Sequence, residues 1–463
     1  MDRRHHFLLV SLSGQGQINP TRQLARRLAR LAGARVTLAN PLFSHRRLFP
    51  TSAAVAGQPD DSTEEEPLNP DGTGIISYAP YSDGYDEGFN PLAGDGYRYM
   101  SDLKSFGSRT IAALVRAFAA GGRPVTCLLY NIILVWVTDV AHDHGIPAVL
   151  HWIQSASVFS IYYHYFNDHR SFNLAACAAN PNSSNTIELP GLPPLRPDKD
   201  LPSILAKPSP YRSTVKDIFT ELDKSEKSRL LVNSFYDLDA QAIKEISRLW
   251  EIIFVGPMME NNFISPATGM GGGDYMDWLQ KQQERSVVYV AFGSLTVLTA
   301  RQTEEVARGL KKSGRPYLWV MRQEGRAEEA EDGNGMVVEW CSQVGVLGHR
   351  AVGCFVTHCG WNSMLEAVGS GVPMVMMPQW MDQTTNAALA EAVWGVGVRA
   401  EAAGDGGLVE AEEIQRCVET VMGDGERGRE VRRRAAVWKE KAGEAAARDG
   451  PAERNLKGFL DGF

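Results

Sequence analysis

Short apolar segments recur along the chain and are separated by stretches in which apolar residues have helical spacing. The first two apolar segments are residues 7–12 and 35–39. Between them, residues 13–20 form a glycine-containing loop ahead of an amphipathic, basic helix at residues 21–31. Apolar runs of about four to eight residues are typical of strands buried in a sheet. The strand–helix–strand order therefore predicts a parallel sheet in an α/β fold.

The same pattern starts again in the second half of the chain. Further strands are predicted in both halves, at residues 127–130, 148–152, 230–234, 287–292, 317–321, 354–358 and 375–378. Residues 258–274 contain GMGGG and are predicted to form a flexible linker between the halves. A chain of 463 residues is too long for a single hydrophobic core. We therefore expect two α/β domains.

Residues 354–373 predict a strand that passes through a tight glycine turn into a helix, which ends at glycine and proline. Such a helix start is a site for phosphate, because free N–H groups and the helix dipole both point at the anion. His358, Asn362 and Ser363 crowd the turn and add hydrogen-bond donors. One alternative stays open: Ser363 and Glu366 have the spacing of a capping box, in which Ser363 only satisfies the start of the helix.

Residues around this turn match the parts of a nucleotide-sugar. Trp340 offers a stacking face to a base, and Glu366, one turn into the helix, can accept hydrogen bonds from two ribose hydroxyls. Asp382 and Gln383 follow another apolar run, where polar side chains at a strand end can bind sugar hydroxyls. A single nucleotide-sugar would engage all four residues.

Residues 340–383 resemble the signature sequence of the plant family-1 UDP-glycosyltransferases. The pattern W-C-x-Q, H-x-A-V-G-x-F-x-T-H-C-G-W-N-S, E, G-V-P and D-Q is complete. Outside it, GQGQINP near the start, LLVNS at residues 230–234 and SVVYVAFGSL at residues 286–295 match other landmarks of the family. The stretches ISYAPYSDGYDEGF and LPGLPPL resemble the subgroup of anthocyanin 5-O-glucosyltransferases and hormone or phenolic-acid glucosyltransferases. The resemblance covers almost the whole chain.

The resemblance implies a donor site for UDP-glucose in the second half of the chain. Trp340 would stack on uracil, Gln343 would reach the nucleoside, Glu366 would hold the ribose, and the donors at the helix start would hold the diphosphate. The last residue of the pattern, Gln383, indicates glucose rather than galactose. The implied donor-binding residues are Ser294, Trp340, Cys341, Gln343, His358, Gly360, Trp361, Asn362, Ser363, Glu366, Asp382 and Gln383.

The fold that the resemblance implies is GT-B, an α/β architecture of two doubly wound, Rossmann-like domains that face each other across a cleft. Residues 1–250 would form an N-terminal acceptor-binding domain, and residues 251–445 a C-terminal UDP-sugar-binding domain. Residues 446–463 would form a C-terminal tail that packs back on the N-terminal domain.

The first loop departs from the family at the residue that would act as the catalytic base. The family has histidine within G-Q-G-H-x-N-P, whereas this chain has Gln17, and an amide accepts no proton at neutral pH. The aspartate that often orients the histidine is Asn131 here. Three interpretations stay open: a variant disabled to trap a complex, acceptors that are already ionised such as carboxylic acids, or another base. His151, at a strand end, is the nearest candidate for that other base.

Aromatic residues of the first half are candidates for an apolar acceptor pocket. Tyr81 and Tyr85, in the sequence PYSDGY, and His151 are the residues that we expect to line it. The aromatic candidates as a set are Tyr81, Tyr85, Phe89, Tyr162, Tyr163 and Phe166. The alternative for most of this set is a place in the core.

Composition narrows the partners further. A net charge of −8 does not favour nucleic acid or an anionic membrane as the main partner. The six cysteines include no C-x-x-C pair, so neither a zinc site nor a disulfide framework is indicated. We expect no metal and no cofactor, with UDP-glucose as co-substrate. No apolar run reaches the ~18 residues that a membrane helix requires. We expect a cytoplasmic monomer.

The sequence thus predicts an inverting, metal-independent transfer of glucose from UDP-glucose to a small aglycone: a flavonoid, a phenolic or carboxylic acid, or a plant hormone. The alternative is a UDP-sugar-binding protein that is catalytically impaired, because Gln17 has replaced the base. A GT-B enzyme of another kind, such as an epimerase or a phosphorylase, is disfavoured by the complete signature sequence.

Overall fold

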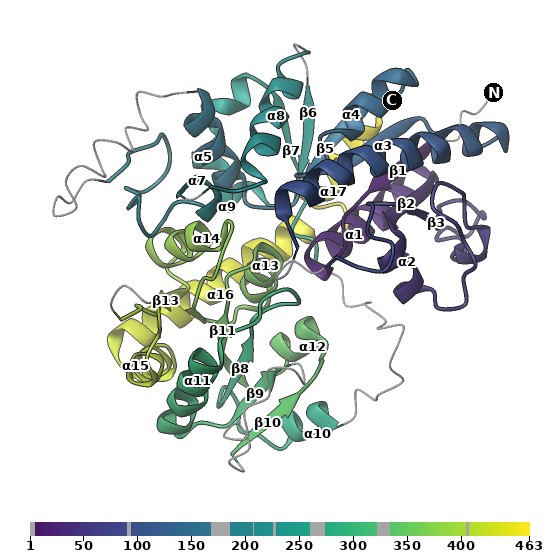
Figure 1. Cartoon of the computed structure of the whole chain (residues 1–463). Helices are drawn as coiled ribbons and strands as arrows, with labels where there is room; N and C mark the ends of the chain where they lie inside the picture. The colour runs from purple at the N-terminus through teal and green to yellow at the C-terminus, as the bar shows by residue number, and fades with distance from the viewer. Residues whose placement is uncertain are drawn as a thin grey trace.

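Two parallel sheets form the two halves of the molecule, which are the upper and lower parts of Figure 1. The computed structural model describes residues 5–89, 94–167, 186–206, 208–225, 228–259, 274–321, 334–403 and 407–463. The linker expected at residues 258–274 lies almost entirely outside the described residues. Two doubly wound domains of this kind are the α/β architecture that the sequence predicts.

The first sheet has seven parallel strands in the order β3-β2-β1-β4-β5-β6-β7. The strands are β1 (His6–Val10), β2 (Arg35–Pro41), β3 (Ile75–Tyr81), β4 (Cys127–Asn131), β5 (Ala148–Trp152), β6 (Arg229–Val232) and β7 (Glu251–Phe254). Most of their residues are buried, as expected for a parallel sheet covered on both faces. Because β7 pairs with β6, the first domain extends past the boundary expected at residue 250.

Helices cover both faces of the first sheet. They are α1 (Gln15–Ala32), α2 (Leu42–Leu48), η1 (Asp61–Thr63), α3 (Gly96–Ala120), α4 (Val137–Asp143), α5 (Ala156–Asn167), α7 (Ser203–Ala206), α8 (Arg212–Leu222), α9 (Tyr236–Ile243) and η2 (Ile246–Arg248). One apolar layer joins the sheet to α3, α5 and α8. The other joins it to α1.

The second sheet has six parallel strands in the order β10-β9-β8-β11-β12-β13. The strands are β8 (Val287–Ala291), β9 (Tyr317–Val320), β10 (Gly335–Val338), β11 (Val352–Thr357), β12 (Met374–Met376) and β13 (Gly397–Arg399). Its helices are α10 (Asp274–Gln280), α11 (Ala300–Ser313), α12 (Gln343–Leu347), α13 (Trp361–Ser370), α14 (Gln383–Leu389), η5 (Ala390–Trp394), α15 (Ala411–Met422) and α16 (Glu426–Ala446).

The C-terminal segment returns to the first domain as α17 (Pro451–Leu460). Its side chains Leu456 and Phe459 are buried in the same apolar cluster as β1 and α1. The Glu453 carboxylate pairs with Arg30 of α1 at 2.8 Å, and Asn455 Nδ2 donates to the carbonyl of Phe254 at 2.9 Å. The chain therefore joins the two domains a second time, after α16, which runs between them in Figure 1.

Helix α1 begins at Gln15, six residues earlier than the sequence pattern predicts. Pro20 lies inside the helix and lacks the N–H that would bond to the carbonyl of Gly16. That carbonyl accepts a hydrogen bond of 3.0 Å from Asn362 Nδ2, which belongs to the second domain. The expected loop, with Gln17 in it, is therefore mostly the first turn of a helix that touches the other domain.

Candidate active site

The predicted strand–turn–helix unit is present between β11 and α13. Cys359, in the turn, has a φ of 67°, and its N–H donates to Thr357 Oγ1 at 3.2 Å. Gly360 occupies the N-cap, and no side chain caps the start of α13. The first N–H groups of the helix are therefore left for an anion, which the helix dipole also attracts.

Ser363 is the third residue of α13, so it is not the N-cap and the capping-box interpretation is wrong. Its hydroxyl accepts a hydrogen bond from Gln343 Nε2 at 2.9 Å, and the same amide donates to Glu366 Oε2 at 2.6 Å. The hydroxyl of Tyr289 in β8 donates to Gln343 Oε1 at 3.2 Å. This network aligns three of the predicted donor-binding residues on one side of the helix start.

The carboxyl of Glu366 is harder to ionise in this network than an ordinary glutamate. Burial raises the pKa of its carboxyl to about 7, while the hydrogen bond from Gln343 acts in the opposite direction. A carboxylate is the acceptor that two ribose hydroxyls require, and charge-assisted bonds of this kind are the stronger ones. The Glu366 carboxyl, partly removed from water, therefore lies at the position predicted for the ribose.

Replacing Glu366 with glutamine should stabilise the ligand-free protein at pH 8 by up to about 3 kcal/mol. The folded-state pKa lies above the value of 4.5 for an ordinary glutamate, so the folded protein loses stability as pH rises from about 4.5 to about 7. The amide of the introduced glutamine has no charge to desolvate. Urea unfolding of both proteins at pH 5.5 and pH 8 would measure this, and a stability difference independent of pH would contradict it.

His358 follows β11 and is packed between two glycine turns. A Cβ on Gly293 would lie 2.6 Å from His358 Nε2, and one on Gly360 would lie 2.5 Å from it, so only glycine fits at either side. Burial lowers the pKa of His358 to about 4, which leaves a neutral imidazole at pH 7. Ser294 is exposed on the same loop as Gly293. His358 and Ser294, two of the predicted donor-binding residues, thus lie at the carboxyl ends of neighbouring strands.

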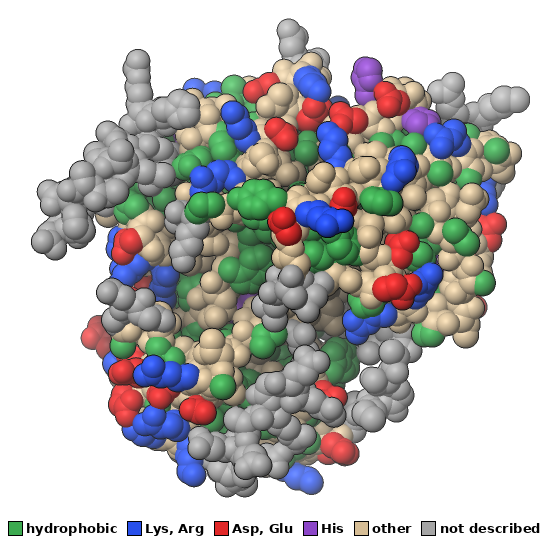
Figure 2. All heavy atoms as spheres, in the orientation of Figure 1, with side chains coloured by type: hydrophobic (Ala, Val, Ile, Leu, Met, Phe, Trp, Pro, Cys, Tyr) green, Lys and Arg blue, Asp and Glu red, His purple; other side chains and the backbone are tan. Residues whose placement is uncertain are grey.

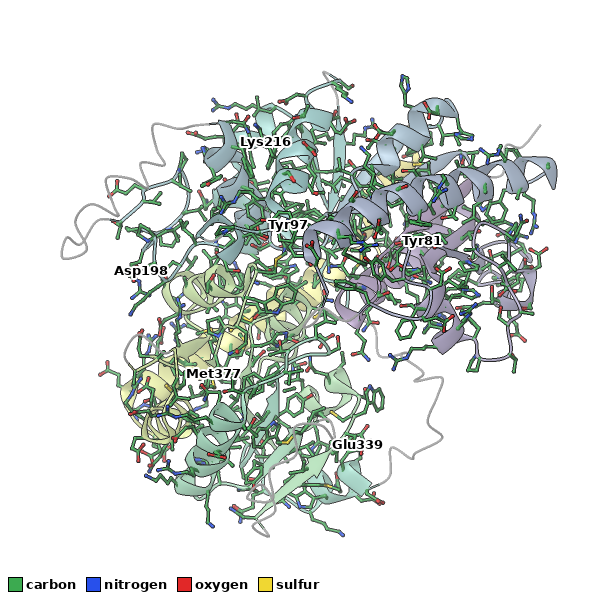
Figure 3. The ribbon with its side chains drawn as sticks, in the orientation of Figure 1. Tyr81, Tyr97, Asp198, Lys216, Glu339 and Met377 are labelled. Carbon is green, nitrogen blue, oxygen red and sulfur yellow. The ribbon has the colours of Figure 1, made fainter. Side chains whose placement is uncertain are left out.

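The predicted base-stacking residue, Trp340, follows β10 and is half-buried. Figure 3 shows its neighbour Glu339 beside α12. Cys341 is buried with its Sγ 3.4 Å from the hydroxyl of Tyr289. Trp361 was also predicted to bind the donor, but its Nε1 donates to the carbonyl of Asn233 in the first domain at 2.7 Å. Its side chain therefore packs between the domains, and a contact with the donor would have to come from its backbone.

Asp382 and Gln383 lie where β12 leads into α14. Burial raises the pKa of Asp382 to about 6, while hydrogen bonds from Asn386, at 2.8 Å, and from Gln154 act in the opposite direction. Gln383 Oε1 accepts hydrogen bonds from the N–H groups of residues 379 and 380. Gln154 lies in the first domain and was not among the predicted site residues. No sequence signal marks it, because the two domains bring it to Asp382 only in the folded chain.

Gln17 and Asn131 form the pair at the positions of the family's base and its orienting residue. Asn131 Nδ2 lies 3.3 Å from Gln17 Oε1 and 3.1 Å from Thr21 Oγ1. Asn131 is buried and Gln17 is half-buried. Both side chains are neutral amides, so the pair can hold an acceptor hydroxyl by hydrogen bonds but cannot take its proton.

His151, the alternative base, lies beside Asn131 in register across β4 and β5. It is 1% exposed, and neither ring nitrogen has a hydrogen-bond partner among the described residues. Burial lowers the pKa of His151 to about 3. A group that holds a proton so weakly is a poor base at neutral pH.

The two tyrosines predicted to line the acceptor pocket, Tyr81 and Tyr85, differ in burial. Tyr81 is fully buried in the core instead of lining a pocket, and its hydroxyl donates to the carbonyl of Ser11 at 3.1 Å. It therefore supports the loop ahead of α1 from inside the first domain, where Figure 3 labels it.

Tyr85 is half-buried, its ring packs on Phe89 and Tyr99, and its hydroxyl donates to Asp102 at 3.0 Å. Figure 2 shows hydrophobic side chains in the hollow between the domains.

Residues 240–441 match the family model of the UDP-glucoronosyl and UDP-glucosyl transferases. A phloretin 4'-O-glucosyltransferase from Malus domestica is 41% identical over 99% of this chain and 98% of its own length. The chain belongs to the UDP-glycosyltransferase family. An anthocyanidin 3-O-glucoside 5-O-glucosyltransferase from Perilla frutescens is 39% identical over 99% of this chain and 98% of its own length.

This UDP-glycosyltransferase also has the GT-B fold of its solved relatives. The structure of Os79 from O. sativa in complex with U2F and trichothecene superposes with a TM-score of 0.82, at 31% identity, over 98% of this chain and 99% of that one. In the parts of the chain that the structure describes, no helix is long and apolar enough to cross a membrane. Across the same residues, no group of three or more histidine, cysteine, aspartate or glutamate side chains is arranged to hold a metal ion.

Proposed function

We propose that this UDP-glycosyltransferase moves glucose from UDP-glucose to a small aglycone, with inversion at the anomeric carbon and without a metal ion. The observation that carries this proposal is the 3.0 Å hydrogen bond between Asn362 Nδ2 and the carbonyl of Gly16. It brings the phosphate end of α13 within one residue of Gln17. A sugar attached to the diphosphate would then lie between the donor residues and the acceptor side, which is the in-line geometry that inversion needs.

The leaving group would be stabilised by hydrogen-bond donors in place of a metal. The start of α13 has no side-chain cap, and neutral His358, Asn362 and Ser363 surround it. Fixed donors and a helix dipole aimed at a developing negative charge are a common source of catalysis. Relatives named for transfer to phloretin and to an anthocyanidin glucoside support a small aglycone as the acceptor.

The acceptor that fits the Gln17–Asn131 pair is one whose oxygen is already ionised. A carboxylate carries its charge at pH 7, whereas a phenol, with a pKa of ~10, must lose a proton during transfer. Neither amide can accept that proton. We therefore propose carboxylic acids as the preferred acceptors, which gives glucose esters as products.

UDP release with a panel of carboxylic acids and a panel of phenols tests this proposal. We expect turnover of the carboxylic acids at a rate that changes little between pH 7 and pH 9. Transfer to phenols should be slower at pH 7 and rise by about tenfold for each pH unit, because the phenolate fraction does so below the pKa. Binding of UDP-glucose without UDP release from either panel would instead support the impaired, UDP-sugar-binding alternative.

A further inference from the structure

A segment between α5 and α8 lies against both domains. Residues 196–205, here called the interdomain strap, are anchored in the first domain by the buried side chains of Leu201, Ile204 and Leu205. Arg212 of α8 donates to the carbonyls of Ile204 and Leu205 at 2.8 and 3.0 Å. One side of the strap is therefore packed into the first domain. Figure 3 shows Asp198 at the outer edge of the molecule, level with the junction of the domains.

The other side of the strap is bonded to the start of α14, where Asp382 is the N-cap and Gln383 the first helical residue. The N–H of Ser203 donates to the carbonyl of Met381 at 2.8 Å, and the N–H of Met381 donates to Ser203 Oγ at 2.7 Å. Thr384 Oγ1 donates to the carbonyl of residue 201, and Thr385 Oγ1 donates to that of residue 200, each at 2.7 Å. Four hydrogen bonds thus join one short strap to the residues on either side of the predicted sugar-binding pair.

Asp200 fastens the strap to the second domain by charge. Its side chain is 4% exposed and lies between Arg196, at 2.9 Å, and Arg399 of β13, also at 2.9 Å. Arg399 donates a further hydrogen bond to the carbonyl of Lys199 at 2.7 Å. A buried carboxylate that is paired with two guanidinium groups cannot leave them without losing both charge-assisted contacts, so its position is fixed.

The backbone of Met381 explains why these bonds matter for the site. Met381 has a φ of 59°, a left-handed conformation that is unfavourable for a residue with a side chain. The paired hydrogen bonds with Ser203 hold it in that conformation. The next residue is Asp382, so the direction in which Asp382 and Gln383 enter the cleft depends on the turn at Met381.

We propose that Ser203 is a positioning residue for the hexose of the donor, through its hold on Met381. This inference rests on the proposed role of Asp382 and Gln383 at the sugar. It means that the first domain helps to set the geometry of the sugar site, although the diphosphate and nucleoside residues all lie in the second domain. The uridine end of the donor, at Trp340 and Glu366, makes no use of the strap.

The test is Ser203→Ala, which removes the hydroxyl that accepts the N–H of Met381 and keeps the other bond of the pair. We expect kcat/KM for UDP-glucose to fall by about tenfold, the upper range for losing one neutral hydrogen bond. The Kd of UDP, which carries no hexose, should change by less than about twofold. Ser203→Thr keeps the hydroxyl and should restore most of the lost kcat/KM.

Ser247→Ala is the matched control, because it removes an exposed serine hydroxyl whose one partner among the described residues is the carbonyl of Lys244. Equal kcat/KM for Ser203→Ala and Ser247→Ala would overturn the proposal. So would a parallel loss of UDP affinity and melting temperature in Ser203→Ala, which is what a merely structural role predicts.

Gln383→Ala separates this proposal from the sugar role on which it rests. A fall in kcat/KM for UDP-glucose with both Gln383→Ala and Ser203→Ala supports both. A fall with Gln383→Ala alone would overturn the role of Ser203 and leave the sugar role in place. If Gln383→Ala has no effect, the sugar role fails and the proposal for Ser203 fails with it.

Discussion

Replacing Gln17 by histidine should raise the rate of glucosyl transfer to a phenol by about 10²–10⁴-fold, the usual range for a general base. Residue 17 lies in the first turn of α1, where Asn131 is within 3.3 Å of its side chain. With the Asn131 amide turned over, so that Oδ1 takes the place of the Nδ2 that now faces residue 17, an imidazole there would have an acceptor for its second nitrogen, which fixes the ring and leaves the first nitrogen for the acceptor proton. Transfer to a carboxylate should change far less, because its oxygen is already charged.

The measurement is the rate with one phenol and one carboxylic acid at saturating UDP-glucose. Gln15→His is the matched control, because Gln15 is exposed two residues earlier in the same helix turn. Adding Asn131→Asp to Gln17→His should raise the phenol rate again, because a carboxylate stabilises the imidazolium that forms. Equal phenol rates for wild type and Gln17→His would show that residue 17 is not the position of a missing base.

Replacing Glu366 by alanine should weaken UDP binding by about 1–3 kcal/mol, or roughly 5- to 150-fold in Kd. The carboxylate is the charged acceptor predicted to bind the ribose, and Gln343 Nε2 donates to it at 2.6 Å. Titration calorimetry at pH 8, where the carboxyl is mostly ionised because its pKa is about 7, measures the loss. The same residue costs stability in the ligand-free protein, so binding and folding should respond in opposite directions.

Glu419→Ala is the control for this measurement, because Glu419 is an exposed glutamate of α15 whose carboxylate pairs with Gln415. Its removal should leave the Kd of UDP unchanged. An unchanged Kd in Glu366→Ala as well would place the ribose elsewhere. The capping role can no longer explain such a result, since Ser363 is not the N-cap of α13.

That the predicted donor residues lie together could be expected from the sequence, because they follow strands of one parallel sheet. His358 follows β11, Asp382 follows β12, and Ser294 follows β8. Carboxyl ends of parallel strands meet at one edge of a sheet, so the sequence order already places these residues together. The start of α1 was not predictable in this way. Proline normally ends or precedes a helix, and the bond from Asn362 to the carbonyl left without an N–H partner exists only between folded domains.

The sequence by itself determined the family and the two α/β sheets, and it predicted the donor residues. Apolar strand runs, glycine turns and the signature pattern are local features that hold wherever the domains lie. Only the tertiary structure decided that Ser363 and Glu366 share one amide partner, that Tyr81 is a core residue, and that Gln154 reaches Asp382. It also decided that Ser203 holds Met381. These contacts join segments far apart in the chain. They form only when the chain buries its core and the two domains pack together, and no local sequence pattern encodes that packing.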